Sequence, residues 1–532
     1  MTRRLCGTCP KPRTCAVSAR DHGRRWADAH LTGRRTGQHR VFDRSRGRGI
    51  RPTRCRVWLG DPDPLDLTEA HMATDNESKR TTSRRRRPRP AAGKDWDRER
   101  YRAQIEQMLR DVNNETFNSS RKVRVIPYPE SKDLADTRFL HREDTILTRD
   151  STAAEVRRIL GIAAPRRPGR RPDPRLPAQI RGLTVLTVPK GETAVSAVQA
   201  VNAVLGRGVA TLDRVLHLTS SSACPATEPI PASGVPVPGI SRHRKLGRGV
   251  KVAVIDTGLH ASTRALAPEH WLEGVDGGLE PASIAGHYVG HGEFVAGVLR
   301  TMAPSAEVYV HPFFFTSGGV IESDLAPLLV HALATSPDII SMSAGIDLSP
   351  EGLADLNSTA QVDDLSDALI SLEAFYEEHL KCSATLLVCA AGNDGNRGPF
   401  APASTCWAVA VGALDAQGRR ADYSNRGPWV DVYARGSDMV NAYPDGSYTY
   451  TEDEGLIGST AYFTHGLARW SGTSFSTPLV AGLVAARMSW SGEPPREAWE
   501  QLLANARVRR GMRVLRPGDA DRGVNPPRGW RG

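Results

Sequence analysis

The sequence predicts an α/β fold in which a mostly parallel sheet has helices on both faces, preceded by a small α+β module and a disordered basic N-terminus. In the back half, short apolar runs that end in polar residues alternate with helical patterns, which is typical of parallel sheets. In the front half, arginine-rich stretches without periodicity precede a short region of mixed strand and helix patterns. A chain of 532 residues is long enough for this organisation.

Charge divides the chain. Residues 1–100 hold 26 Lys and Arg against 12 Asp and Glu, a net charge of +14, and residues 101–250 hold 24 against 14, or +10. Residues 251–532 hold 20 against 33, or −13. The overall charge of +11 therefore does not describe the back half.

Five regions are expected along the chain. They are a basic disordered region over 1–95, a small α+β module over 96–219, a linker over 220–248, the sheet domain over 249–512 and a tail over 513–532. One hypothesis is that translation starts at Met72, so that residues 1–71 are not part of the protein. The run Arg84-Arg-Arg-Arg-Pro-Arg-Pro lacks interleaved aromatic residues, so we favour a solvated tail over nucleic-acid binding.

Composition bears on location and on metals. The first residues show no apolar signal-peptide core and no stretch reaches membrane-spanning length, so we expect no membrane partner. Eight cysteines are too few for a disulfide framework. No metal site is expected, since one C-x-x-C without a second pair at zinc spacing is all that is found among Cys6, Cys9, Cys15 and Cys55. These observations predict a cytoplasmic protein.

Apolar periodicity gives the expected elements. In the module we expect helices over 96–112, 151–160 and 194–205, and strands over 122–127, 183–188 and 215–218 or slightly earlier. In the back half we expect strands over 250–255, 307–310, 338–343, 386–391 and 408–411, and a helix over 325–333. In a parallel sheet, polar groups just past the strand ends line the ligand crevice.

A serine lies at the start of an apolar helical pattern near the C-terminus. Ser474 stands in Trp470-Ser-Gly-Thr-Ser-Phe-Ser-Thr-Pro478. A helix N-terminus offers unpaired N–H groups and a positive dipole end, which suit a nucleophile whose reaction develops negative charge. Serine is also an ordinary helix-capping residue, and for this motif alone capping is the favoured interpretation.

Three further motifs each have a structural explanation when taken singly. Asp256 in Asp256-Thr-Gly could cap the next helix, and His291 in His291-Gly-Glu-Phe-Val-Ala-Gly297 could be a packed side chain. Asn393 in Ala390-Ala-Gly-Asn-Asp-Gly-Asn396 could stabilise a turn. Only in combination with Ser474 do these motifs indicate a functional site rather than structural roles.

In the order Asp, His, Asn, Ser these motifs resemble those of the subtilisin-like serine proteases (subtilases). The corresponding family stretches are D-T-G, H-G-T-H-V-A-G, A-A-G-N and G-T-S-M-A-x-P. Ile339-Ile-Ser-Met-Ser-Ala-Gly345 is similar to the family's substrate-lining strand, and Tyr423-Ser-Asn-Arg-Gly-Pro-Trp-Val-Asp-Val432 resembles its later S-N-x-G-x-x-V-D segment. The resemblance covers roughly residues 249–510.

The resemblance implies a subtilisin-like fold and a serine endopeptidase with a catalytic triad. His291 would take the proton of Ser474, and Asp256 would hold the imidazole in the right tautomer. The side chain of Asn393 and the backbone N–H of Ser474 would form the oxyanion hole.

The resemblance also implies partners and cofactors. The substrate would be a peptide or protein, bound along Ser343, Ala344 and Gly345. No cofactor is required. Calcium often stabilises the family, but no acidic loop with ligand spacing supports a calcium site in this sequence.

Several positions depart from the family pattern. H-G-T-H becomes His291-Gly-Glu293-Phe294, Phe475 and Ser476 replace Met and Ala, and Ala434-Arg435-Gly436 replaces A-P-G. Glu293 would raise the basicity of His291 if it lay close enough. An extra acidic segment over 350–381 is interpreted as a solvated helix face, with attraction of basic peptides or of the chain's own basic front half as the alternative.

The role of the front module is left open between two functions. Many subtilases carry a small α+β propeptide that covers the cleft, and residues 121–219 could be such a piece in contact with the active site. A retained recognition or adaptor domain fits equally well. Two rival functions for the whole chain are a catalytically silent binding protein and a nucleic-acid-associated protein, the latter confined by charge to the front half.

Overall fold

The computed structural model describes residues 94–113, 123–163, 180–218, 226–261, 272–280, 288–314, 318–348, 369–450 and 456–520. All of them belong to one compact unit. The predicted basic region, apart from its last two residues, and the proposed start at Met72 lie outside the described residues. No helix among the described residues is long and apolar enough to cross a membrane.

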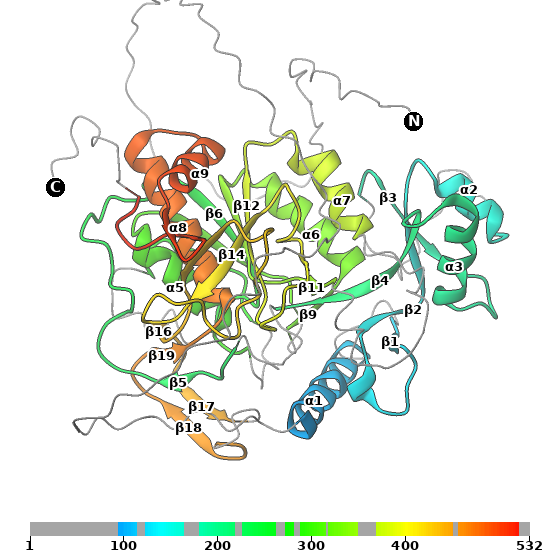
Figure 1. Cartoon of the computed structure of the whole chain (residues 1–532), viewed down its shortest axis with the longest axis horizontal. Helices are drawn as coiled ribbons and strands as arrows, with labels where there is room; N and C mark the ends of the chain where they lie inside the picture. Colours follow the sequence, from blue (N-terminus) through cyan, green and yellow to red (C-terminus); the bar gives the residue numbers. More distant parts are fainter. Residues whose placement is uncertain are drawn as a thin grey trace, which may run out of the picture. The chain divides into compact units, whose positions relative to one another are not determined.

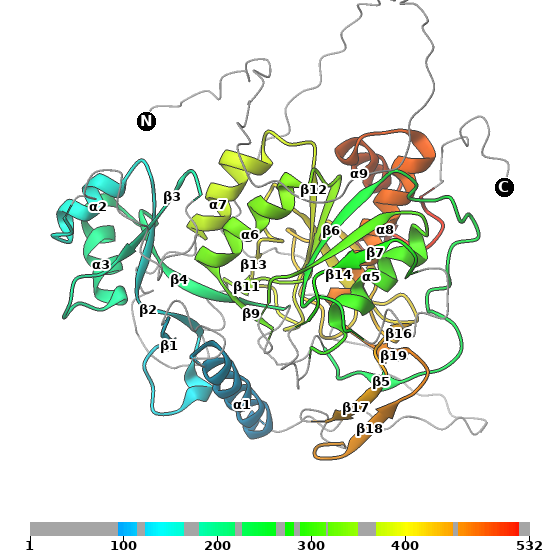
Figure 2. The same ribbon diagram turned by 180° about the vertical axis from the view of Figure 1, so that it is seen from behind.

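A nine-stranded sheet forms the back half (Figures 1 and 2). Its order is β20-β21-β15-β14-β12-β10-β6-β8-β7, and every pairing is parallel except that of β20 with β21. The strands are β6 (Lys251–Asp256), β7 (Val275–Gly277), β8 (Glu307–Pro312), β10 (Ile339–Met342), β12 (Leu386–Ala390), β14 (Val409–Leu414), β15 (Val432–Arg435), β20 (Arg507–Arg509) and β21 (Met512–Val514). The prediction of a mostly parallel sheet is confirmed.

Helices cover both faces of this sheet. Successive side chains of a strand point to opposite faces. Val252 and Val254 of β6 accordingly pack in the core that holds α5 (His291–Met302) and α8 (Thr473–Ser491). Ala253 and Ile255 pack in a second core with α6 (Glu322–Ala334) and α7 (Ile370–Phe375), while α9 (Pro495–Ala504) lies against α8.

The front module forms a smaller sheet with helices beside it. Its elements are α1 (Lys94–Asn113), β1 (Val125–Tyr128), η1 (Leu134–Asp136), β2 (Phe139–Arg149), α2 (Ala153–Ile159), β3 (Leu183–Thr187), α3 (Ala194–Leu205) and β4 (Ala210–His217). Strand β2 was not expected, because His141 to Thr145 interrupt its apolar pattern with five consecutive polar residues. Strand β4 also pairs with β9 (Gly319–Ile321) of the back half, so one sheet spans both halves.

Shorter strands complete the described fold. They are β5 (Ile230–Pro231), β11 (Ile346–Asp347), β13 (Phe400–Ala401), β16 (Met439–Ala442), the hairpin of β17 (Gly446–Thr449) with β18 (Thr460–Phe463), and β19 (Leu467–Trp470), and a π-helix, η4 (Tyr376–Leu380), follows α7. Two predicted boundaries differ from the structure. Strand β5 lies inside the predicted linker, and the predicted tail begins within β21 and continues into the core with Leu515 and Ala520.

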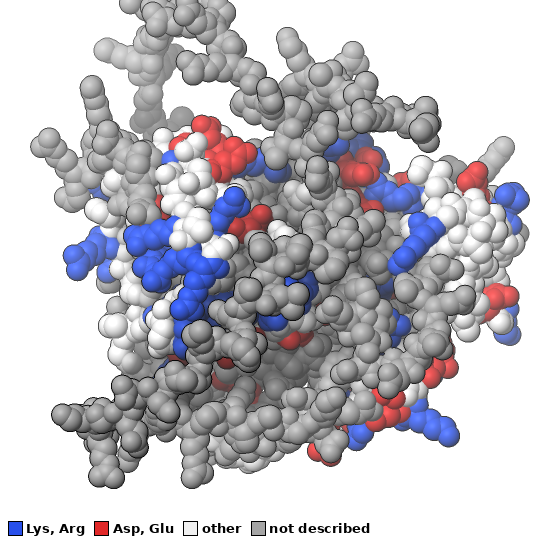
Figure 3. Space-filling view, viewed as in Figure 1, with Lys and Arg blue, Asp and Glu red and all other residues white. Residues whose placement is uncertain are grey.

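Lys and Arg side chains gather in one group on the left of the face shown in Figure 3, whereas elsewhere on this face positive and negative side chains lie beside each other. The edge strand β20 exposes Arg507 and Arg509. Charges on an edge strand discourage pairing with other chains. The net negative charge of the back half gave no indication of this basic group on β20.

One cysteine bond was not expected. Cys406 is in a disulfide bond. The cytoplasmic location stays a prediction.

Candidate active site

Asp256 and His291 meet where β6 ends and α5 begins. His291 Nδ1 lies 2.7 Å from Asp256 Oδ1, and both side chains are fully buried. The start of α5 can approach this strand end only because residue 292 is glycine: a Cβ there would lie 2.2 Å from the carbonyl oxygen of Gly258. The structure therefore places a carboxylate against one nitrogen of a buried imidazole.

Ser474 is the second residue of α8 and is fully buried. Its carbonyl oxygen accepts a hydrogen bond of 3.1 Å from Ser343 Oγ. His291 Nε2 is buried and makes no hydrogen bond, so the serine and the imidazole are not hydrogen-bonded to each other here. Such bonds are often long before substrate is bound and tighten only in the reacting complex.

Asn393 follows β12 and points at the start of α8. Its Oδ1 accepts hydrogen bonds of 2.8 Å from the backbone N–H and from Oγ1 of Thr473. A backbone N–H can only donate, which identifies the amide oxygen as the atom facing Thr473. The amide NH2 is therefore directed away from Thr473, the residue that precedes Ser474 in the chain.

The three residues expected to line the substrate follow β10. Gly345 exchanges two backbone hydrogen bonds with His217 at the end of β4, of 2.8 and 2.9 Å. The next residue, Leu218, donates from its backbone N–H to Gly318 O at 2.9 Å. The end of β4 thus lies between two backbone segments of the back half, while Ala344 is buried and Ser343 contacts Ser474.

One sequence family matches the back half of the chain, which holds these residues. The subtilase family (Peptidase S8) matches residues 247–519, just over half of the chain. The chain belongs to the subtilase family.

Curated relatives agree with the family. The chain is 28% identical over 249 residues to the thermophilic serine proteinase of Bacillus sp. (strain AK1), covering 44% of this chain and 51% of that protein. It is 29% identical over 264 residues to subtilisin Savinase of Lederbergia lenta, covering 48% of this chain and 81% of that protein. The chain thus spans about half the length of the first of these relatives.

Solved structures also match. The prenylagaramide maturation protease PagA matches with 24% identity and a TM-score of 0.38, covering 52% of this chain and 94% of that one. The patellamide maturation protease PatA matches with 24% identity and a TM-score of 0.36, covering 51% and 96%.

Two departures from the subtilase pattern form one cluster. Phe294 replaces the family's second histidine and Phe475 its methionine, and their ring centroids lie 4.5 Å apart. Trp470 contacts both rings, and the ring centroids of Trp470 and Phe475 each lie 5.5 Å from that of His291. The two substitutions therefore compensate each other in packing, and Phe475 and Trp470 place aromatic rings against the imidazole.

Two further carboxyl groups, those of Glu293 and Glu280, lie near Asp256 and His291. Glu293 Oε1 accepts a hydrogen bond from the backbone N–H of His260. Burial and the neighbouring Glu293 raise the pKa of Glu280 to about 9. The sequence-based expectation placed Glu293 beside His291, whereas its described electrostatic effect is on Glu280. No sequence motif pointed to Glu280.

The acidic segment before β12 contacts the front module. Arg149 forms an ion pair with Glu377, and Arg181 Nε lies 2.8 Å from Glu378 Oε2. Glu377 remains 56% and Glu378 34% exposed, so these two residues are solvated and also attracted to the chain's own front half. The residues of this segment before Leu369 lie outside the described part. Because the pairs are largely exposed, each stabilises the contact only weakly.

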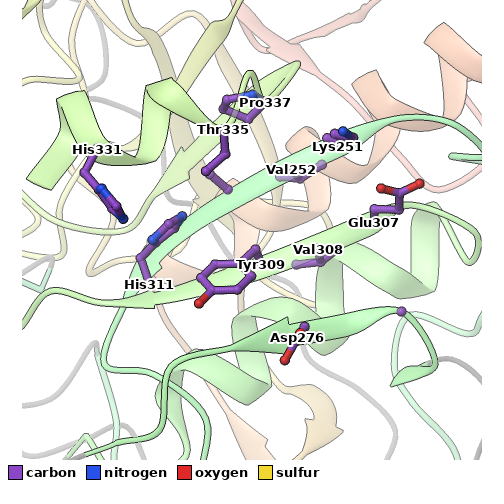
Figure 4. A pocket seen from close by; sticks show the side chains of 12 residues that line it. Lys251, Val252, Asp276, Glu307, Val308, Tyr309, His311, His331, Thr335 and Pro337 are labelled. Atoms are coloured by element: carbon purple, nitrogen blue, oxygen red, sulfur yellow. The ribbon is translucent and has the colours of Figure 1, made fainter. Parts of the chain in front are cut away.

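A hollow of about 560 Å³ lies away from these residues (Figure 4). It is bordered by Lys251 and Glu307 at the starts of β6 and β8, and by His331 and Thr335 at the end of α6. Ligands of parallel sheets bind at the opposite, carboxyl ends of the strands. The hollow is therefore separate from the site formed by Asp256 and His291. No group of three metal-binding side chains is found in the described part of the chain.

Proposed function

We propose that the chain is a serine endopeptidase in which Asp256, His291 and Ser474 form the catalytic triad. The observation that carries this proposal is the buried 2.7 Å contact between Asp256 Oδ1 and His291 Nδ1 beside the start of α8. That contact leaves His291 Nε2 as the nitrogen that would receive the serine proton. The relatives named as serine proteinases support the same chemistry.

The proposed reaction has two steps. Ser474 Oγ attacks the substrate carbonyl while its proton moves to His291 Nε2, and His291 then protonates the leaving amine. Water hydrolyses the acyl-enzyme by the same path in reverse. Asp256 stabilises the imidazolium that forms in each step without taking up the proton.

Asn393 is proposed as a donor of the oxyanion hole together with the backbone N–H of Ser474. Thr473 holds the amide oxygen, which leaves the NH2 to face developing charge. We expect Asn393→Ala to lower kcat roughly 100- to 1,000-fold with little change in KM, the size known for this donor in subtilisin. Steady-state peptide hydrolysis measures this. Asn425→Ala serves as the comparison, because the amide oxygen of Asn425 accepts a hydrogen bond from the backbone N–H of Asp394 instead. An unchanged kcat for Asn393→Ala would remove this residue from the oxyanion hole.

We further propose that the front module is an internal cover of the cleft rather than an adaptor. His217 and Leu218 engage Gly345 and Gly318 by backbone hydrogen bonds, as an extended peptide substrate would. The fully buried state of Ser474 and His291 supports a latent form in this arrangement. Removal of the cover would precede access of a protein substrate.

A buried contact fastens this cover to α6. Asp213 of β4 accepts hydrogen bonds of 2.9 and 2.6 Å from the backbone N–H and Oγ of Ser323. Arg142 Nη1 lies 3.7 Å from the same carboxylate, and both side chains are buried. Removal of a buried, charge-assisted partner costs about 1.5–3 kcal/mol. The contact therefore contributes strongly to module docking.

We expect Asp213→Ala to raise peptide hydrolysis by the full chain about 10-fold or more, because it weakens the docked cover. The rate of hydrolysis of a small peptide by the full chain measures this. Asp144→Ala is the matched control, an exposed aspartate on β2 of the same module. Equal activity of Asp213→Ala and wild type, with both folded, would contradict the cover.

One experiment separates the peptidase from a silent binding protein. A fluorophosphonate probe should label the wild-type chain, and labelling should require both Ser474 and His291. Labelling that persists in Ser474→Ala, or that never appears even after the module is released, would overturn the peptidase proposal. A silent binding protein would bind peptides without any labelling.

A further inference from the structure

One oxygen of Glu280 accepts hydrogen bonds from the two segments that carry Asp256 and His291. Glu280 Oε1 lies 3.0 Å from Thr257 Oγ1 and 2.9 Å from the backbone nitrogen of Gly290. Thr257 directly follows Asp256, and Gly290 directly precedes His291. Glu280 therefore connects the end of β6 to the start of α5.

The hydroxyl of Thr257 extends this connection. It lies 3.0 Å from Glu280 Oε1 but 3.4 Å from Asp256 Oδ1, so its single proton is better placed for Glu280. Thr257 Oγ1 also accepts a hydrogen bond of 3.3 Å from the backbone N–H of Gly292. Asp256 Oδ1 is then left to the backbone N–H of Thr257 and to His291.

The backbone around Glu280 is fastened as well. Gly278 N donates to Val310 O, Leu259 N to Gly278 O, and Glu280 N to Leu259 O, at 2.9 to 3.0 Å. The side chain of Glu280 is only 8% exposed. A buried side chain on a backbone held by such hydrogen bonds can keep its partners at fixed positions.

We propose that Glu280 is a positioning residue that ties the segment after Asp256 to the start of α5 and so sets the Asp256–His291 contact. This inference rests on the proposed peptidase function. Glu280 touches neither substrate nor the reacting atoms; it acts through Thr257 and Gly290.

The charge state of Glu280 follows from its surroundings. Burial and the Glu293 carboxylate of α5 raise the pKa of Glu280 to about 9, and Asp256 at the end of β6 adds to this, against the hydrogen bonds from Thr257 and Gly290. Glu280 is thus a neutral acid at neutral pH, which avoids another negative charge beside Asp256. The folded chain keeps this proton while the unfolded chain releases it near 4.5, so stability falls as pH rises from about 4.5 to about 9.

Two substitutions separate positioning from bulk structure. We expect Glu280→Gln, which keeps a neutral acceptor, to retain kcat within about threefold. Glu280→Ala should lower kcat roughly 10- to 100-fold, leave KM nearly unchanged and shift the acidic limb of the kcat/KM profile. Glu307→Gln, an exposed glutamate of β8, is the matched control. Full activity of Glu280→Ala, or an equal loss in Glu280→Gln, would overturn the proposal.

A readout without turnover keeps this test apart from the peptidase proposal. The downfield proton resonance of the Asp256–His291 hydrogen bond should persist in full-length Glu280→Gln and disappear in Glu280→Ala, with Asp256→Asn as assignment control. The gain in melting temperature of Glu280→Gln over wild type should grow between pH 6 and pH 9. If no variant shows Ser474-dependent activity, the peptidase proposal fails. An unchanged resonance in Glu280→Ala overturns the positioning role independently.

Discussion

Ser474→Ala should abolish peptide hydrolysis, lowering kcat roughly a millionfold, the size known for the nucleophile of subtilisin. The loss is this large because the triad acts as a unit: without Oγ there is no acyl-enzyme, and His291 has no proton to receive. The substitution removes one buried oxygen and keeps the carbonyl that accepts from Ser343 Oγ. We therefore expect the melting temperature to change little. Single-turnover kinetics and thermal unfolding measure the two effects.

Ser476→Ala is the matched control for this substitution. Ser476 lies two residues further along α8, is equally buried, and donates from Oγ to Thr473 O at 3.0 Å. It should retain activity within about tenfold, since a lost neutral hydrogen bond costs only about 0.5–1.5 kcal/mol. Equal losses at the two positions would mean that α8 is merely disturbed. Substantial hydrolysis by Ser474→Ala would exclude this serine as the nucleophile.

The central sheet could be predicted because its strands are buried on both faces. Strands β6, β10 and β12 are nearly continuous apolar runs with a polar residue at their end or shortly after it, a local pattern visible without any pairing information. The helix α3 lies at 194–205 as predicted, since its apolar positions recur at helical spacing.

Elements that depend on distant partners could not be predicted. Strand β9 has three residues and exists through its pairing with β4, more than a hundred residues earlier in the chain. The polar residues of β2 include Arg142, which makes sense only beside Asp213. Such pairings carry no local period, so the sharing of one sheet between the module and the body became visible only in the structure.

The residues of the site were likewise predictable only where a local sequence motif marks them. Asp256, His291, Asn393 and Ser474 were named because each stands in a motif with fixed neighbours. Glu280 stands in no motif, and its connection to Thr257 and Gly290 depends on how two loops fold together. Phe294 and Phe475 were noted as two separate departures, although they form one contact. Compensation between distant positions is not readable from a single sequence.

Asp256→Asn should lower kcat roughly 10,000-fold with KM nearly unchanged, the size known for the same change in a Ser-His-Asp protease of unrelated fold. The buried contact with His291 Nδ1 is the reason. Asp256 Oδ1 accepts from both His291 and the Thr257 N–H, whereas Oδ2 is buried without a hydrogen-bond partner. An asparagine must either bury an unsatisfied NH2 at Oδ2 or turn that NH2 against two donors.

Either orientation of the asparagine removes the negative charge that stabilises the imidazolium. With the NH2 at the Oδ2 position, the imidazole stays in place but lacks its counter-charge. With the NH2 turned toward His291 Nδ1, the wrong tautomer of the imidazole is favoured. Steady-state kinetics across pH measures the loss. Asp276→Asn is the control, because it makes the same change on the exposed strand β7 of the same sheet. A loss below about tenfold in Asp256→Asn would show that His291 works without this carboxylate, and the triad would reduce to a serine–histidine pair.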